Sequence, residues 1–253
     1  MRQDELDNRV EEHLKKYKTE VLYVKDKEDN HVNLEDNFIE DCFETLRKYY
    51  DKEEFKSYGT DLKSDKIMGM NMVVPLLEDE KLFKTFLSHI LDKNLEEISD
   101  IKYVEFDKVI NNDVNNDIDF FVQLNSGEKI YFEFTYWQDN FGSFIGENNQ
   151  EIWEKELSKQ KDKSLYLKDI GREEFCKNFR LNRNISLIES DKDYLVFIYP
   201  FENDALKERM ELFKYKNLIE VDLHEIIYFI LKLDLGQKLE EYYKEFSRKY
   251  LIY

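Results

Sequence analysis

The chain has 253 residues and a formal net charge of −18, and 42% of its residues are hydrophobic and 15% aromatic. This apolar content excludes a disordered chain, and the charge argues against a protein that coats nucleic acid non-specifically, since such coating needs clustered Lys and Arg. A nuclease is not excluded, because a local basic patch can attract a substrate while the acids lie elsewhere.

Other features of the composition indicate a cytoplasmic protein with no membrane partner. The two cysteines, Cys42 and Cys176, form neither a disulfide framework nor a zinc motif, and they fit a reducing compartment. The longest apolar run, residues 226–231, is too short to span a membrane, and the charged N-terminus is not a secretory signal. No pattern predicts an oligomeric state.

The first third of the chain reads mainly as helix. Residues 3–17 carry dense charge and few apolar positions, which predicts an exposed helix. Residues 37–51 and 79–93 show apolar residues at helical spacing, and the apolar segment 64–79 between them is interrupted by Pro75.

The pattern then changes to three strands, and after them to helices with two further strands between them. Residues 101–109, 117–124 and 129–137 alternate as strands, and Gly127 lies in a short turn between the last two. Residues 193–200 form an apolar run that predicts a strand buried on both faces. The remaining segments predict helices at 149–165, 172–188, 205–213, 224–233 and 236–250, and a strand at 218–223.

This order predicts an α/β fold with a central mixed sheet and helices on both faces. Because only 2 Pro and 7 Gly interrupt the chain, no stretch reads as a flexible linker. We therefore expect residues 1–253 to form a single domain, with a peripheral helical part at 1–60, a core at 64–222 and C-terminal helices at 223–253.

The predicted hairpin carries two acids, Asp119 and Glu133. Alternation along the second strand divides its side chains between two faces, the first set being Tyr131, Glu133 and Thr135 and the second Phe132, Phe134 and Tyr136. The three aromatic side chains of the second set mark the core side. Asp119, across the hairpin, can lie beside Glu133.

Two adjacent carboxylates repel each other unless a positive charge joins them. Mg²⁺ or Mn²⁺ fits, because hard cations prefer oxygen ligands, and the Phe134 carbonyl can supply a further oxygen. In the alternative interpretation, Asp119 only begins a strand and Glu133 is exposed on a sheet edge.

The hairpin resembles the PD-(D/E)XK nuclease superfamily, in which an acid begins one strand and Glu-x-Lys lies on the next. The nearest likeness is to a bacterial group of nuclease-like proteins of this superfamily. Three segments carry it: residues 64–79, residues 119–142, and residues 174–188 with the strand after them. The resemblance implies a restriction-endonuclease-like core and a Mg-dependent phosphodiester hydrolase.

The chain departs from this pattern at two positions. Thr135 stands where such nucleases carry the motif Lys, and Arg180 stands near a position that is often Gln in the group. The resemblance assigns the lysine to positioning water and stabilising charge on the phosphate. Threonine can hydrogen-bond a water but has no charge, so Arg180 and Arg183 are the expected substitutes.

These arginines lie on a predicted helical face together with Arg172 and Cys176. An arginine cluster beside a metal-bound carboxylate suits a phosphodiester backbone. The alternative is a salt-bridge surface within an acidic protein.

The leading hypothesis is a metal-dependent nuclease in which Asp119 and Glu133 bind Mg²⁺, Thr135 orients water, and Arg180 or Arg183 balances charge. The expected substrate is nucleic acid, with DNA favoured over RNA. A further acid from a preceding helix, Glu78 or Asp79, could complete the site. The rival hypothesis is a catalytically inactive nuclease fold that binds protein or nucleic acid.

Overall fold

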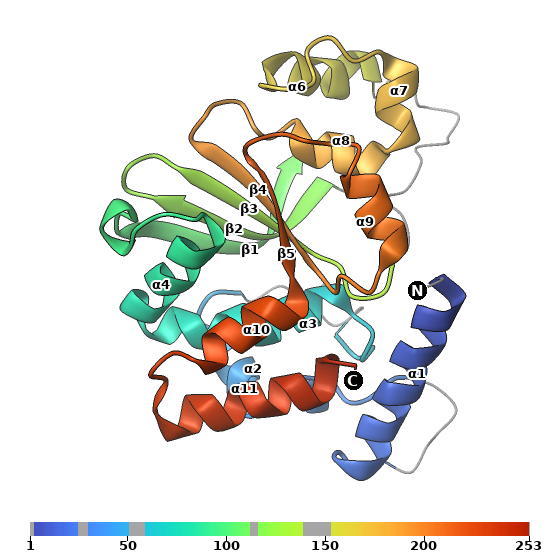
Figure 1. Cartoon of the computed structure of the whole chain (residues 1–253), viewed down its shortest axis with the longest axis vertical. Helices are drawn as coiled ribbons and strands as arrows, with labels where there is room; N and C mark the ends of the chain where they lie inside the picture. Colours follow the sequence, from blue (N-terminus) through green and yellow to red (C-terminus); the bar gives the residue numbers. More distant parts are fainter. Residues whose placement is uncertain (1–2, 25–29, 51–58, 112–115, 139–152, 253) are drawn as a thin grey trace.

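A five-stranded mixed sheet forms the centre of the protein (Figure 1). The computed structural model describes residues 3–24, 30–50, 59–111, 116–138 and 153–252. The strands follow the order β1-β2-β3-β4-β5, in which β1, β2 and β3 are antiparallel neighbours and β3, β4 and β5 run parallel. Their bounds are Ile101–Asn111, Asn116–Leu124, Lys129–Phe134, Asp193–Tyr199 and Leu218–Asp222.

The predicted hairpin and the predicted buried strand are both confirmed. Gly127 turns the chain between β2 and β3 with φ +90°, a conformation that glycine adopts without steric cost. β4 lies between β3 and β5, and six of its seven residues are buried. The apolar run at 193–200 is therefore an interior strand of the same sheet as the hairpin.

Helices cover both faces of the sheet (Figure 1). One layer contains α1, α2, α3, α4, α10 and α11, which span Gln3–Glu20, Cys42–Leu46, Asp65–Val73, Glu80–Ile90, Leu223–Leu231 and Gly236–Tyr250. The other contains α6, α7, α8 and α9, which span Ser158–Lys163, Arg172–Lys177, Phe179–Ile185 and Asp204–Met210. A π-helical turn, Trp153–Leu157, precedes α6, and 3-10 turns in the described part of the chain lie at Glu35–Asn37, Val74–Glu78 and Leu95–Glu97.

Each face has its own hydrophobic core, as strand alternation requires. Phe120, Phe132 and Phe134 belong to the larger core beneath α3 and α4. Phe121 and Tyr131 belong to the smaller core beneath α7 and α8. The predicted division of side chains along β3 is therefore confirmed, and Glu133 lies on the α8 side.

Helix α3 packs very closely against β3. A Cβ atom built at Gly69 would lie 2.1 Å from Cδ2 of Phe134, so no residue with a side chain fits there without a shift. Ser64 caps the helix, its hydroxyl accepting the Ile67 N–H at 3.3 Å. The Asp65 carboxylate accepts the Tyr136 N–H, which holds the first turn of α3 beside the end of β3.

Two predicted helices are interrupted in the structure. The helix predicted at 37–51 is interrupted before the short α2, because Glu40 has φ +45°, a left-handed conformation that a right-handed helix does not contain. The segment 172–188 is broken at Asn178, which has non-helical backbone angles and separates α7 from α8. The arginine face predicted along one continuous helix is therefore wrong.

The first helix is also less exposed than predicted. Helix α1 buries Leu6, Val10, Leu14 and Tyr17, which recur every three or four residues, and it contacts α11. The single-domain division stays a prediction, and residues 139–142 of the nuclease-like stretch lie outside the described residues. Within the described ranges, no helix is long and apolar enough to cross a bilayer.

A fully buried lysine joins α11 to the N-terminal half of the chain. Nζ of Lys249 donates to the backbone carbonyl and the side-chain oxygen of Asn37, and it lies 5.0 Å from the Tyr250 ring centroid. Burial lowers the pKa of Lys249 to about 7, because desolvation disfavours its charged form. The Asn37 carbonyl also accepts a hydrogen bond from Asn71.

This lysine should make the stability of the protein depend on pH. An unfolded lysine titrates near about 10.4, so between pH 7 and 10 the unfolded chain binds a proton that the folded chain lacks. The folded state should therefore lose stability as pH falls from 9 to 7, by on the order of 1.4 kcal/mol per pH unit. Urea unfolding of Lys249→Met should show a flatter pH dependence than the unaltered protein, and identical slopes would contradict the prediction.

Candidate nuclease-like site

Glu133 is the most deeply buried acid of the hairpin. It lies on β3, an interior strand, and its side chain has no exposed surface. Its Oε2 accepts a hydrogen bond from Nη2 of Arg180 at 2.5 Å. The alternative in which Glu133 is exposed on a sheet edge is therefore wrong.

Asp119 lies beside Glu133, as the hairpin pattern predicted. Because Phe120 pairs with Phe132 and the two strands are antiparallel, the neighbouring residues Asp119 and Glu133 lie opposite each other. Asp119 is 4% exposed, and its Oδ2 accepts the Phe134 N–H at 2.9 Å. Burial and the nearby Glu133 charge raise the pKa of Asp119 well above its usual range.

Arg180 joins the two carboxylates from the helical layer above them. It lies in the first turn of α8, and its Nη2 is 3.9 Å from Oδ2 of Asp119. Its Nη1 donates to the side chain of Gln138 at 3.3 Å. The negative charges of Glu133 and Asp119 raise the pKa of Arg180, so the guanidinium remains the counter-charge of the buried acids.

A third buried acid comes from the other face of the sheet. Asp65 lies in the first turn of α3, and its Oδ1 accepts the Tyr136 N–H at 2.7 Å just beyond the end of β3. Burial raises the pKa of Asp65 to about 7. Arg180 lowers that pKa and Glu133 raises it, so Asp65 shares the electrostatic environment of the hairpin acids.

The next residue, Lys66, contacts acidic side chains on strands β1 and β2. Its ammonium group contacts Oδ1 of Asp107 at 2.7 Å and forms a short ion pair with Asp117. Burial alone would lower the pKa of Lys66, but the charges of Asp119, Asp107 and Asp117 together raise it. Asp107 has φ +46°, an uncommon conformation for a residue with a side chain.

The remaining predicted site residues occupy different positions. Thr135 is buried just past the end of β3, and its N–H donates to the Ile198 carbonyl at 3.0 Å. Arg183 is buried on α8 and donates to the Asp117 carbonyl at 3.4 Å and to Oδ1 of Asn184 at 3.0 Å. Burial lowers the pKa of Arg183. Arg180 is therefore the arginine whose guanidinium directly pairs with Glu133.

The further acid expected from a preceding helix is neither Glu78 nor Asp79. Glu78 forms an exposed ion pair with Lys48, and Asp79 caps α4 by accepting the Leu82 N–H. The charged residues near the hairpin that sequence analysis missed are Asp65 and Lys66. Their signal was a charged pair directly after the capping Ser64, at the start of an otherwise apolar segment.

The pair of acids fits a divalent cation in one respect. The buried Oε1 of Glu133 has no hydrogen-bond partner among the described residues. A buried carboxylate oxygen without a partner is costly unless a cation or another donor satisfies it. The residues therefore fit a hard cation, whereas Arg180 already neutralises part of their charge.

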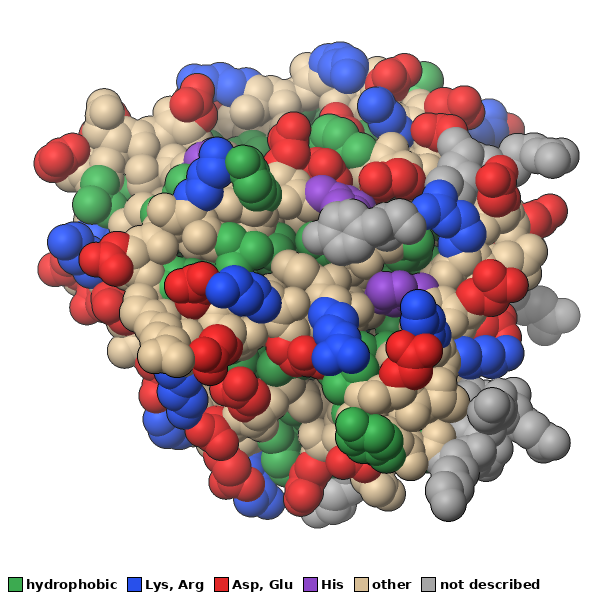
Figure 2. All heavy atoms as spheres, turned by 60° about the horizontal axis from the view of Figure 1, so that its bottom comes forward, with side chains coloured by type: hydrophobic (Ala, Val, Ile, Leu, Met, Phe, Trp, Pro, Cys, Tyr) green, Lys and Arg blue, Asp and Glu red, His purple; other side chains and the backbone are tan. Residues whose placement is uncertain are grey.

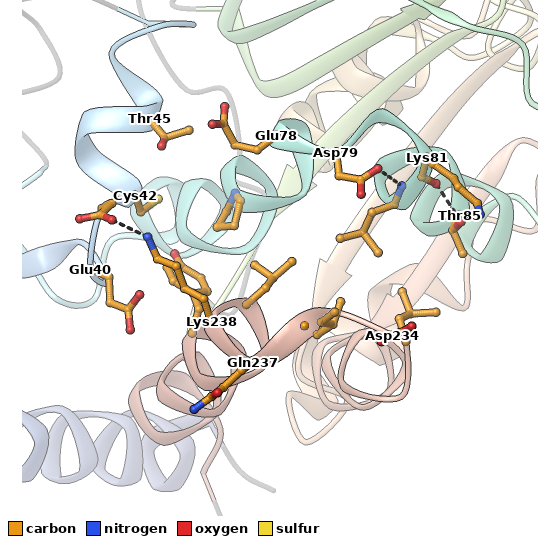
Figure 3. A pocket seen from close by; sticks show the side chains of 18 residues that line it. Glu40, Cys42, Thr45, Glu78, Asp79, Lys81, Thr85, Asp234, Gln237 and Lys238 are labelled. Carbon is orange, nitrogen blue, oxygen red and sulfur yellow. Dashed lines mark hydrogen bonds and ion pairs between the residues drawn. The ribbon is translucent and has the colours of Figure 1, made fainter.

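A second concave region lies away from these acids. A groove of about 900 Å³ lies between the start of α4 and the turn joining α10 to α11 (Figure 3). Its lining includes five carboxylates and two lysines, and Lys238 is paired with Asp41 at 2.7 Å. The face that comes forward in Figure 2 carries interspersed acidic and basic side chains. An acidic groove repels phosphates, so it does not suit a nucleic-acid backbone.

The mixed sheet with helices on both faces defines an α/β protein with a restriction-endonuclease-like core. The chain belongs to the family described as "Restriction Endonuclease associating with ARP", whose sequence profile matches residues 3–251. This family suggests a nuclease-like function. No curated protein and no solved structure matches the chain.

The pairing of Arg180 with Glu133 predicts a strong coupling in stability. Arg180→Met leaves a buried glutamate without its cation and should cost about 3–5 kcal/mol of unfolding free energy. Adding Glu133→Gln should recover much of that loss, because the unpaired charge is removed. Urea unfolding of both single variants and the double variant measures the coupling, and additive losses would contradict the ion pair.

Proposed function

We propose that the protein is a metal-dependent nuclease of the PD-(D/E)XK type in which the motif lysine is replaced from another element. The observation that carries the proposal is the buried pair Asp119 and Glu133, with an unsatisfied Glu133 oxygen, on a restriction-endonuclease-like core. The substrate is nucleic acid, DNA before RNA, and the reaction is hydrolysis of a phosphodiester bond.

The acids supply the cation site. Asp119 and Glu133 would hold Mg²⁺ or Mn²⁺ through carboxylate oxygens, with the Phe134 carbonyl as a further ligand. When bound, such a cation lowers the pKa of a water and polarises the phosphate. The Phe134 N–H fixes the Asp119 carboxylate against β3, so one ligand is already held in place.

Lys66 supplies the positive charge that Thr135 lacks. Its raised pKa keeps the ammonium protonated at neutral pH, so Lys66 does not act as a general base. It acts instead by stabilising negative charge that develops on the phosphate. The negative charge of Asp119 contributes to the raised pKa of Lys66, which supports a role for this ammonium group near the proposed cation site. In this proposal Thr135 orients the water, and Arg183 contributes charge from α8.

Arg180 favours a second function. Its guanidinium already neutralises Glu133 and approaches Asp119, as expected if the acids no longer bind metal. The protein would then be an inactive nuclease fold that binds a protein or nucleic acid. The family description names association with ARP, and we extend that association to this chain as part of the second function.

The cation site predicts a metal-dependent gain in stability. At Mn²⁺ or Mg²⁺ concentrations about 100-fold above the dissociation constant, the folded state should gain about 2.7 kcal/mol. Thermal unfolding should show this gain in the unaltered protein and lose it in Asp119→Asn. Asp169→Asn, which removes an exposed acid elsewhere, is the matched control. The absence of any shift at millimolar Mn²⁺ would refute the cation site.

The role of Lys66 predicts a defined pattern of cleavage rates. Lys66→Met should lower Mg-dependent cleavage of DNA by roughly a hundredfold, and Lys66→Arg should retain more activity because it keeps the charge. Thr135→Lys should partly rescue Lys66→Met by restoring the Glu-x-Lys pattern. The assay compares single- and double-stranded DNA and RNA. Should the unaltered protein and Thr135→Lys both be inert on every substrate, the binding function replaces the nuclease.

A further inference from the structure

Three side chains of metal-binding type meet at the ends of β4 and β5. Asp222 is the last residue of β5, His224 lies in the first turn of α10, and Glu202 follows β4. One possible ligand atom from each lies within 4.8 Å of the other two, and this is the one such group in the described part of the chain. The register Tyr199↔Asp222 aligns the ends of the two strands.

The backbone holds this cluster in place. Oδ1 of Asp222 accepts the Phe201 N–H at 3.1 Å and the His224 N–H at 3.4 Å. The same carboxylate therefore connects the turn after β4 to the start of α10. Nδ1 of His224 lies 3.8 Å from Oδ1 of Asp222 and 3.5 Å from Oε2 of Glu202.

We propose that Glu202, Asp222 and His224 form a binding site for a first-row transition-metal cation such as Zn²⁺. Donor atoms around such an ion lie about 2.0–2.2 Å from it, and hence roughly 3–4 Å from one another. The present separations are close to that range. Glu202 is exposed, so its side chain can close the remaining gap without disturbing the core.

A small cavity adjoins two of the three side chains, Glu202 and His224, whereas Asp222 does not line it. A cavity of about 10 Å³ is lined by Glu202 and His224 together with Arg9, Tyr136 and Ile252. This volume is about that of one small sphere such as a water molecule. A cation there would join the end of β4, the start of α10 and the last described residues of the chain, which makes the site structural or regulatory.

The ligand set distinguishes this site from Asp119 and Glu133. Imidazole nitrogen suits Zn²⁺ and similar metals, whereas Mg²⁺ takes oxygen ligands in a strict octahedron. The Glu202 site should therefore prefer Zn²⁺ strongly over Mg²⁺. Its existence does not depend on whether the protein is a nuclease.

The test is Zn²⁺ titration of the full chain, followed by calorimetry and by NMR of the histidine side chains. The chain has 4 histidines, so the ring signals of His224 can be assigned by comparison with His224→Gln. We expect Zn²⁺ to shift the His224 ring signals, whereas Mg²⁺ leaves them in place. Glu202→Gln and Asp222→Asn should each weaken Zn²⁺ binding roughly tenfold or more.

Two controls locate the binding. Glu208→Gln removes an exposed acid from the neighbouring helix α9 and should leave Zn²⁺ affinity unchanged. Glu133→Gln should also leave it unchanged, which separates this site from the hairpin acids. Because Glu202 is exposed, its variant should fold normally.

The proposal is overturned if Zn²⁺ leaves the His224 signals unmoved, or if Glu202→Gln and Asp222→Asn bind Zn²⁺ as tightly as the unaltered protein. Either result would mean that the three side chains form an ion-pair network in which a protonated His224 is the cation.

Discussion

The burial of the Glu133 carboxylate in the middle of the sheet determines how the surrounding elements are arranged. A charge removed from water needs a partner inside the protein, and Arg180 provides it from α8. This requirement holds α8 over the hairpin acids and keeps the guanidinium beside Asp119. With Asp65 approaching from the opposite face, three buried acids together raise the pKa of the Arg180 guanidinium, while burial and the Glu133 charge raise the pKa of Asp119 and Asp65.

Alternation along the hairpin was enough to predict the sheet, its two faces and the meeting of Asp119 with Glu133. The pattern is local, so it can be read from neighbouring residues. Asp65 and Lys66 could not be placed in the same way, because packing of α3 against β3 brings them to the site from more than 50 residues earlier in the chain. The break at Asn178 was also missed, because apolar spacing persists across it although the backbone angles change.

The two sites lie at one edge of the sheet. β3, β4 and β5 are parallel, so Thr135, Glu202 and Asp222 all lie at or just beyond the carboxyl ends of their strands. In open α/β sheets, ligands commonly bind at this edge, where loops rather than strands determine the chemistry. A shared edge therefore brings the oxygen-only pair Asp119 and Glu133 and the nitrogen-containing cluster around His224 to the same side of the sheet, where we propose two different cations bind.

The close contact at Gly69 ties the position of Asp65 and Lys66 to the packing of the core. These residues lie about one helical turn before Gly69, and that glycine rests directly on Phe134. A hairpin transplanted alone into another scaffold would therefore carry Asp119 and Glu133 without the lysine and the third acid. The smallest portable unit of this site is therefore α3 and α8 together with β2 and β3, because α8 supplies the Arg180 counter-charge and α3 rests on β3 at a contact that admits no side chain.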